Sequence, residues 1–191
     1  FADAGGGGAW NLISTTVIDD LGAATLTITG LNSSTYHTFM VAMTGLTTNG
    51  DNKNFSVLLG DSSGIDNGSS DYSFVVLGQK GASEANFTGG TGMKDNASNK
   101  ILINNSNHAS VGNASGESLS SVFYIQTATA VNMFPFIHGT STYINNAGAA
   151  TLMTFAGARL SAITVDRFQL LSDATLIADG GSISVYGLAK S

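Results

Sequence analysis

Cysteine is absent from the sequence, proline occurs once, and charged residues are scarce. The absence of cysteine excludes disulfide bonds, thiol catalysis and zinc sites with cysteine ligands. Charged residues make up 10% of the chain, against a usual share of about 25% in globular proteins. The surface must therefore consist largely of small and neutral polar residues, which suits a protein whose faces meet other proteins or sugars.

The few charges that remain also exclude some partners. The formal net charge is −6, and the seven lysines and arginines form no basic run. Binding to nucleic acid depends on neutralising phosphates, so no nucleic-acid partner is expected. No apolar stretch approaches the roughly 20 residues needed to span a bilayer, so we expect no membrane partner.

What the sequence does contain is apolar residues at period two, the pattern of half-buried strands. In "YHTFMVAMT", His37, Phe39, Val41 and Met43 share one face, and Met40 and Ala42 share the other. Similar patterns predict strands near residues 24–29, 55–59, 72–77, 100–103, 122–125, 133–138, 152–160 and 163–171, and at the end of the chain.

No segment has a sustained helical stripe, so βαβ units are excluded. We predict an all-β fold: one antiparallel β-sandwich domain, jelly-roll-like, spanning residues 10–191 and built of about ten short strands.

The closing stretch "DGGSISVYGLAKS" is strand-like almost to the last residue. Ile183, Val185 and Gly187 share one face, and Ser184, Tyr186 and Leu188 share the other. Chain ends usually fray unless something holds them. We therefore predict an interior or subunit-facing strand.

Two segments depart from the strand pattern. Residues 1–9, in "FADAGGGGAW", contain four consecutive glycines and predict a flexible arm, either a linker or a segment that orders on a neighbouring subunit. In the second case Phe1 and Trp10 are the expected partner-binding residues. Residues 78–116 predict a polar, loop-rich insertion around one short strand, and long loops of this kind are often functional.

One acidic cluster is a candidate metal site. Asp61, Asp66 and Asp71 lie five residues apart in "GDSSGIDNGSSDYS", and such a loop could supply oxygens to Ca²⁺. The spacing fits neither an EF-hand nor a calcium-binding β-roll. Since Asp, Asn, Gly and Ser also build ordinary tight turns, we favour a turn and expect no metal.

No catalytic or cofactor-binding constellation is recognisable. A G-x-S-x-G motif and phosphate-binding glycine loops are missing, and His37, His108 and His138 are isolated from one another. The two glutamates, Glu84 and Glu117, both lie in the polar middle of the chain, where nothing identifies them as a glycosidase pair. We expect no enzyme activity and no cofactor.

The strand edges favour assembly. Lysine and proline normally protect exposed edges from pairing with other chains, and both are scarce here. Either bulges protect these edges or the edges pair with neighbours, and the second alternative favours self-association.

Several stretches resemble small β-sandwich virion proteins of tailed bacteriophages. They are "AWNLIST", "ATLTITGLNSSTYHTFMVAMTGL", "NFSVLLGDSSGIDNGSSDYSF" and the ending "GGSISVYGLAK". Shared features are the turn before Tyr36, the Gly/Ser/Asp loop between Leu58 and Tyr72, and the ending Val185-Tyr186-Gly187-Leu188.

The resemblance implies a jelly-roll-like, often trimeric structural protein without catalytic residues. We expect a homotrimer in the virion, assembled in the host cytoplasm, that acts as a capsid decoration (cement) protein and contacts the major capsid protein or fibre and tail proteins. The alternative is a head- or tail-fibre receptor-binding module. In that case loops 78–116 and Tyr72 or Tyr143 would bind a host-surface glycan, with the rings stacking on sugars.

Overall fold

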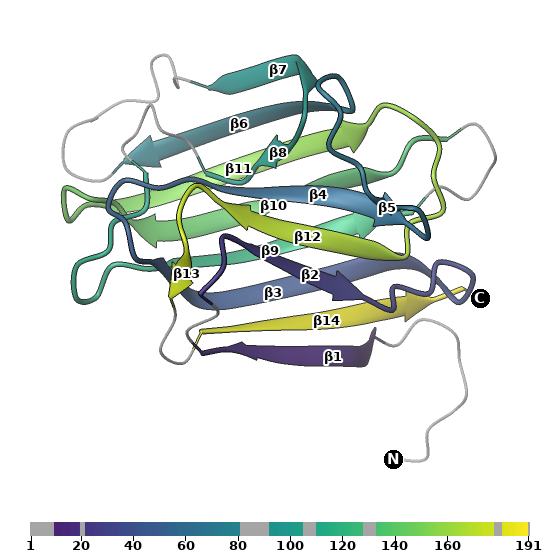
Figure 1. The fold of residues 1–191 in the computed structure, drawn as a ribbon, viewed down its shortest axis with the longest axis horizontal. Coiled ribbons are helices and arrows are strands. Elements are labelled where there is room, and N and C mark those ends of the chain that lie inside the picture. The colour runs from purple at the N-terminus through teal and green to yellow at the C-terminus, as the bar shows by residue number, and fades with distance from the viewer. Residues whose placement is uncertain are drawn as a thin grey trace.

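The computed structural model describes residues 10–19, 22–80, 92–104, 110–127, 133–177 and 181–190. Within these ranges the chain is all-β, and two antiparallel sheets pack face to face (Figure 1). The predicted all-β sandwich is confirmed. Nowhere in the described ranges does a helix long and apolar enough to cross a membrane occur. The predicted arm, residues 1–9 with Phe1, lies outside the described residues, as does His108.

The larger sheet has nine strands, eight of them in one continuous path. In spatial order these are β1 (Trp10–Ile18), β14 (Gly181–Ala189), β3 (Tyr36–Thr48), β9 (Leu119–Gln126), β10 (Phe136–Ile144), β11 (Ala150–Arg159), β6 (Tyr72–Lys80) and β7 (Met93–Ser98). The ninth, β13 (Leu176–Ile177), pairs with the end of β3.

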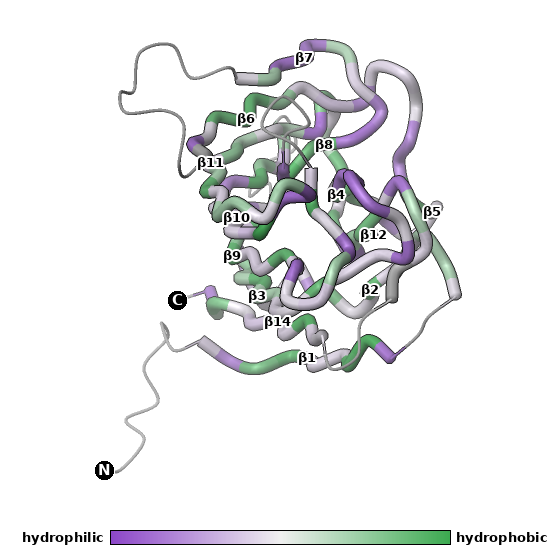
Figure 2. Tube along the Cα trace, turned by 90° about the vertical axis from the view of Figure 1, so that its left-hand side faces the viewer, coloured by the Kyte–Doolittle hydropathy of each residue, from purple (hydrophilic) through white to green (hydrophobic). Residues whose placement is uncertain are grey.

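The smaller sheet has five strands and lies in front of the larger one in Figure 1. Its path is β2 (Thr25–Thr29), β12 (Arg167–Ser172), β4 (Phe55–Asp61) and β5 (Gly64–Ile65), and β8 (Ile101–Leu102) pairs with β4. Figure 2 shows the sheets from the side, with the nine-stranded sheet on the left and the five-stranded sheet on the right.

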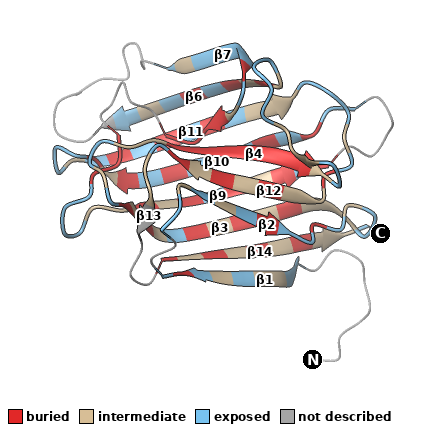
Figure 3. Ribbon diagram, in the orientation of Figure 1, coloured by how far each residue is buried: buried red, intermediate tan, exposed pale blue. Residues whose placement is uncertain are grey.

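The core forms where the inner faces of the two sheets meet. Along β9 buried and accessible residues alternate, as period-two patterning requires (Figure 3). The buried Phe123 of β9 lies 6.0 Å, centroid to centroid, from Phe168 of β12, and 6.1 Å from Phe155 of β11. The first contact crosses between the sheets, so Phe123 joins both layers of the sandwich.

The last strand is an interior strand, as predicted. β14 pairs with β1 on one side and with β3 on the other. Ile183 and Val185 are buried in the core, whereas Ser184, Tyr186 and Leu188 face outward and are partly accessible. The chain end is therefore held by two hydrogen-bonded neighbours.

The polar middle of the chain contains more structure than its composition predicts. Instead of one strand near residues 100–103, the structure has β7 and the two-residue strand β8. β7 reads "MKDNAS", which has no apolar alternation, because it is an edge strand with most side chains in solvent. Residues 81–91 and 105–109 of this insertion lie outside the described part of the chain.

Candidate functional site

The outward side chains of the nine-stranded sheet form a broad surface, which we call the outer face. It comprises the outward residues of β1, β14, β3, β9, β10, β11 and β6, and it ends at the edge strand β7, where the exposed Lys94 pairs with Val75. The pairing register places these residues in rows across the strands. One row contains Leu12, Tyr186, Met40, Tyr124, His138, Ala156 and Val75.

The outer face has no formal charge and much exposed apolar surface. Among the side chains that the structure describes on these seven strands, no outward one belongs to Asp, Glu, Lys or Arg. Leu12 and Val17 on β1 are 60% and 65% exposed. Other large apolar side chains that are substantially exposed on this face are Trp10, Val75, Leu77, Val122, Phe136 and Leu152. Contiguous apolar patches of this kind commonly mark interaction sites.

Part of the outer face is hollowed. A concavity of about 440 Å³, which we call the hollow, lies over β10 and β11. Its floor includes the small outward residues Thr140, Thr154 and Ala156. Its sides are formed by larger residues, Val75 and Leu77 of β6 and Val122 and Tyr124 of β9. His138 of β10 also lines the hollow, which is deepest over the small side chains that lie between larger ones on the neighbouring strands.

Gly139 also lines the hollow, and its lack of a side chain has a packing reason. A Cβ at this position would point into the core and lie 2.4 Å from the Cβ of Phe123. The glycine lets β10 lie close against Phe123, the residue that joins the two sheets.

Aromatic rings lie across the middle of the outer face. Tyr124 of β9 stacks on His138 of β10, with centroids 5.3 Å apart and an interplanar angle of 27°. Trp10 of β1 reaches over two intervening strands to within 6.0 Å of the Tyr124 ring. Trp10, predicted as a partner-binding residue, therefore belongs to the outer face.

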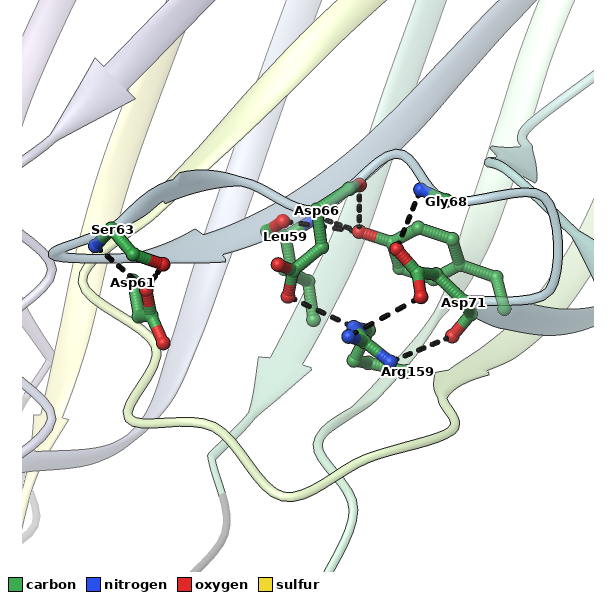
Figure 4. A network of polar contacts seen from close by, with 8 residues as sticks. Leu59, Asp61, Ser63, Asp66, Gly68, Asp71 and Arg159 are labelled. Atoms are coloured by element: carbon green, nitrogen blue, oxygen red, sulfur yellow. Dashed lines mark hydrogen bonds and ion pairs between the residues drawn. The ribbon is translucent and has the colours of Figure 1, made fainter.

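The three candidate calcium ligands do not converge on one point (Figure 4). Asp66 and Asp71 bind the guanidinium of Arg159, with N–O distances of 2.8 and 3.3 Å. Asp61 instead accepts hydrogen bonds from the amide and hydroxyl of Ser63, and the hydroxyl bond is the largest cause of a lowered pKa of Asp61. Among the described residues, no group of three or more His, Cys, Asp or Glu side chains could hold a metal.

Tyr72 anchors this loop to the sandwich (Figure 4). Its ring is buried, and its hydroxyl accepts a hydrogen bond from the Leu59 amide at 2.8 Å and lies 2.8 Å from the Asp66 carbonyl, to which it can donate. Burial raises the pKa of Tyr72, so the neutral phenol is the stable form. The contacts of Asp66, Asp71 and Tyr72 serve to fix the loop.

The tyrosines predicted to stack on sugars are wrongly placed for that role. Tyr72 is fully buried and Tyr143 is 3% exposed, because both side chains point into the core between the sheets. His37 is on the accessible end of β3, where its Nδ1 lies 3.0 Å from the Leu188 carbonyl. Of the aromatic residues on the outer face, sequence reasoning identified Trp10 but missed Tyr124 and His138 as neighbours, since their strands come together only in the sheet.

Comparison of the sequence with protein-family models and with curated proteins finds no match in either. The function is therefore argued from the geometry of the outer face.

Proposed function

We propose that the protein is a non-enzymatic structural component of a phage virion, most simply a capsid decoration (cement) protein, and that it works by association through its outer face. The observation that supports this proposal is the combination, on seven adjoining strands of one sheet face, of described outward side chains without formal charge and many exposed large apolar side chains. Association would remove those side chains from water.

The energetics favour an interface. Burial of apolar surface contributes roughly 25 cal/mol per Å², so several half-exposed Leu, Val and Phe side chains together contribute several kcal/mol. Because no described outward side chain of the seven strands is charged, association through those side chains desolvates no ion of theirs, and desolvating an unpaired ion is costly. Cementing requires nothing more, because contacts that span several shell subunits stabilise the assembled state by mass action.

The resemblance to phage virion proteins supports the location in the virion. Its ending, Val185-Tyr186-Gly187-Leu188, corresponds to β14, where Tyr186 and Leu188 lie on the outer face. The ending Val185-Tyr186-Gly187-Leu188 thus belongs to an interior strand and also contributes side chains to the outer face. Assembly in the host cytoplasm follows from a role in the virion.

The experiment compares the thermal release of DNA from particles with and without the protein. Stripped particles are expected to release DNA at a lower temperature, and added wild-type protein should restore the higher one. A Val122→Lys variant, which places a charge on the outer face, should restore less than a Thr25→Lys variant on the opposite sheet. Equal release temperatures for stripped and complete particles would contradict decoration.

A second function, binding of a host-surface glycan by a fibre module, is favoured by the aromatic rings on the outer face. Trp10, Tyr124 and His138 lie next to one another, and exposed rings of this kind can stack on the apolar faces of sugars. This function would be favoured over decoration if the wild-type protein binds immobilised glycans, Tyr124→Ala abolishes that binding, and the protein does not bind virion shells.

A further inference from the structure

The outer face has two unlike halves. On one half, the side chains of Leu12 and Val17 project from β1 and are the most exposed large apolar side chains in the described part of the chain. We call these two residues the ridge. The other half contains the hollow, which lies about 20 Å from the ridge, since four to five strand intervals separate them.

We infer that the partner of the outer face is a second copy of this chain, with the ridge of one copy seated in the hollow of the next. This inference rests on the proposed function and names the partner at its surface. Each copy carries both a ridge and a hollow, so the same contact can be made twice in a two-fold pair or repeated in a closed ring.

The charge distribution fits a contact between identical copies. The chain has a net charge of −6, so two copies repel each other over most orientations. On the outer face they meet without carboxylates, because no described outward side chain of its seven strands is charged and the charge that borders it is a lysine, Lys94 of β7. The orientation that brings two outer faces together therefore avoids juxtaposed carboxylates.

The polar groups of the outer face are also self-complementary. Many are hydroxyls, which can both donate and accept a hydrogen bond. They already pair with one another within the sheet, as in Thr15 with Ser184 and Thr44 with Ser182, both at 3.0 Å. A second copy presents the same hydroxyls and can satisfy those at the contact.

The size of the outer face matches that of a stable interface. Six strand intervals by about eight residues measure roughly 29 by 26 Å, or about 750 Å². Stable interfaces bury about 800 Å² on each partner. Contact over most of this face would therefore be needed, and the ridge and the hollow lie near its opposite ends.

The test measures self-association of the purified full chain by light scattering and sedimentation over a range of concentrations. Wild type is expected to self-associate. Thr154→Lys fills the floor of the hollow with a charge and should weaken association at least about tenfold. The matched control, Thr25→Lys, places the same charge on the exposed face of the five-stranded sheet and should associate like wild type.

A charge pair then tests the seating of the ridge in the hollow. Leu12→Glu alone should weaken association like Thr154→Lys, whereas the double variant L12E/T154K should recover much of it, because every ridge–hollow contact then pairs opposite charges. Circular dichroism confirms that each variant is folded. Three results would overturn the inference. They are a Thr154→Lys variant that associates as strongly as wild type, a Thr25→Lys variant that is weakened as much as Thr154→Lys, and a folded double variant that associates no more strongly than the single variants.

Binding to particles separates this inference from the proposed function. A wild-type protein that stays monomeric but still binds virion shells overturns the second-copy contact and leaves decoration standing. A protein that self-associates through the ridge and hollow but does not bind shells supports the contact and contradicts decoration.

Discussion

The outward faces of the two sheets follow the same period-two pattern but carry different side chains. On the five-stranded sheet, the outward residues of β2 are threonines, and the outward residues of β12 opposite them are Arg167, Gln169 and the partly accessible Leu171. Gln169 donates to the Thr27 hydroxyl at 2.9 Å, and Arg167 pairs with Asp166 at 2.6 Å. On the seven strands of the outer face the described outward side chains have no charge and include Leu12, Val17 and Leu77, and a charge appears only beside them, at Lys94 of the edge strand β7.

This difference shows that the residues that favour a strand are not the same as the residues that suit a face exposed to water. Threonine, valine and aromatic residues all favour strands, so both faces meet the backbone requirement equally well. Only one of them also has the polar and charged groups that are usual on a face left in water. The outer face of the nine-stranded sheet instead has the features of an interface, and its inner face has those of a core.

The largest expected effect contrasts the two faces of β9 at adjacent residues. Phe123→Ala removes a buried ring that contacts both Phe155 and Phe168, and should lower the free energy of unfolding by about 3–5 kcal/mol. Val122→Ala, one residue earlier on the outer face, should lower it by about 0.5 kcal/mol. Urea unfolding followed by tryptophan fluorescence measures both.

The two variants must be compared at one low protein concentration, because self-association stabilises the folded state. Similar losses for Phe123→Ala and Val122→Ala in the monomer would mean that the two faces of β9 do not differ as described. If the loss of unfolding free energy in Val122→Ala grows with protein concentration, Val122 lies in a contact between copies, and the two faces of β9 differ in function as well as in burial.

A smaller effect is expected from removal of a single hydroxyl. Tyr72→Phe leaves the buried Leu59 amide without the acceptor that lies 2.8 Å away, which should cost about 1–3 kcal/mol of unfolding free energy. The matched variant Tyr124→Phe, on the outer face, should cost about 0.5 kcal/mol or less. Thermal unfolding of both variants measures the loss of unfolding free energy. A larger loss for Tyr124→Phe than for Tyr72→Phe would contradict the role of the Tyr72 hydroxyl as a buried acceptor.

The sequence predicts much of the fold because alternation is a local property. It places Phe39, Val41 and Met43 on one face of β3 and Met40 and Ala42 on the other, and the first three are indeed buried. β7 escapes prediction because an edge strand in solvent needs no apolar pattern.

The candidate site is less predictable because it depends on strand order. The hollow requires β10 and β11 to lie between β9 and β6, and Trp10 meets Tyr124 only because β14 and β3 place β1 and β9 in one sheet. Alternation also does not tell which face of a strand meets the core, so the sequence allows Tyr72 or Tyr143 on a sugar-binding surface, although both are buried.

The smallest expected effect concerns acid, and it separates the charged loops from the uncharged outer face. Hydrogen bonds from Ser63 hold the pKa of Asp61 below its ordinary value of 3.8, so the carboxylate stabilises the folded protein above that pH. This contribution is lost as the pH falls through the lower, folded-state pKa.

Asp61→Asn should therefore flatten the decline in unfolding free energy between about pH 5 and pH 2, by on the order of a few tenths of a kcal/mol because water screens this site. Thr154→Val on the outer face removes no titrating group and should leave that decline unchanged. Chemical unfolding at a series of pH values measures the decline in unfolding free energy. A steeper decline in Asp61→Asn than in wild type would contradict a stabilising role of the Asp61 carboxylate.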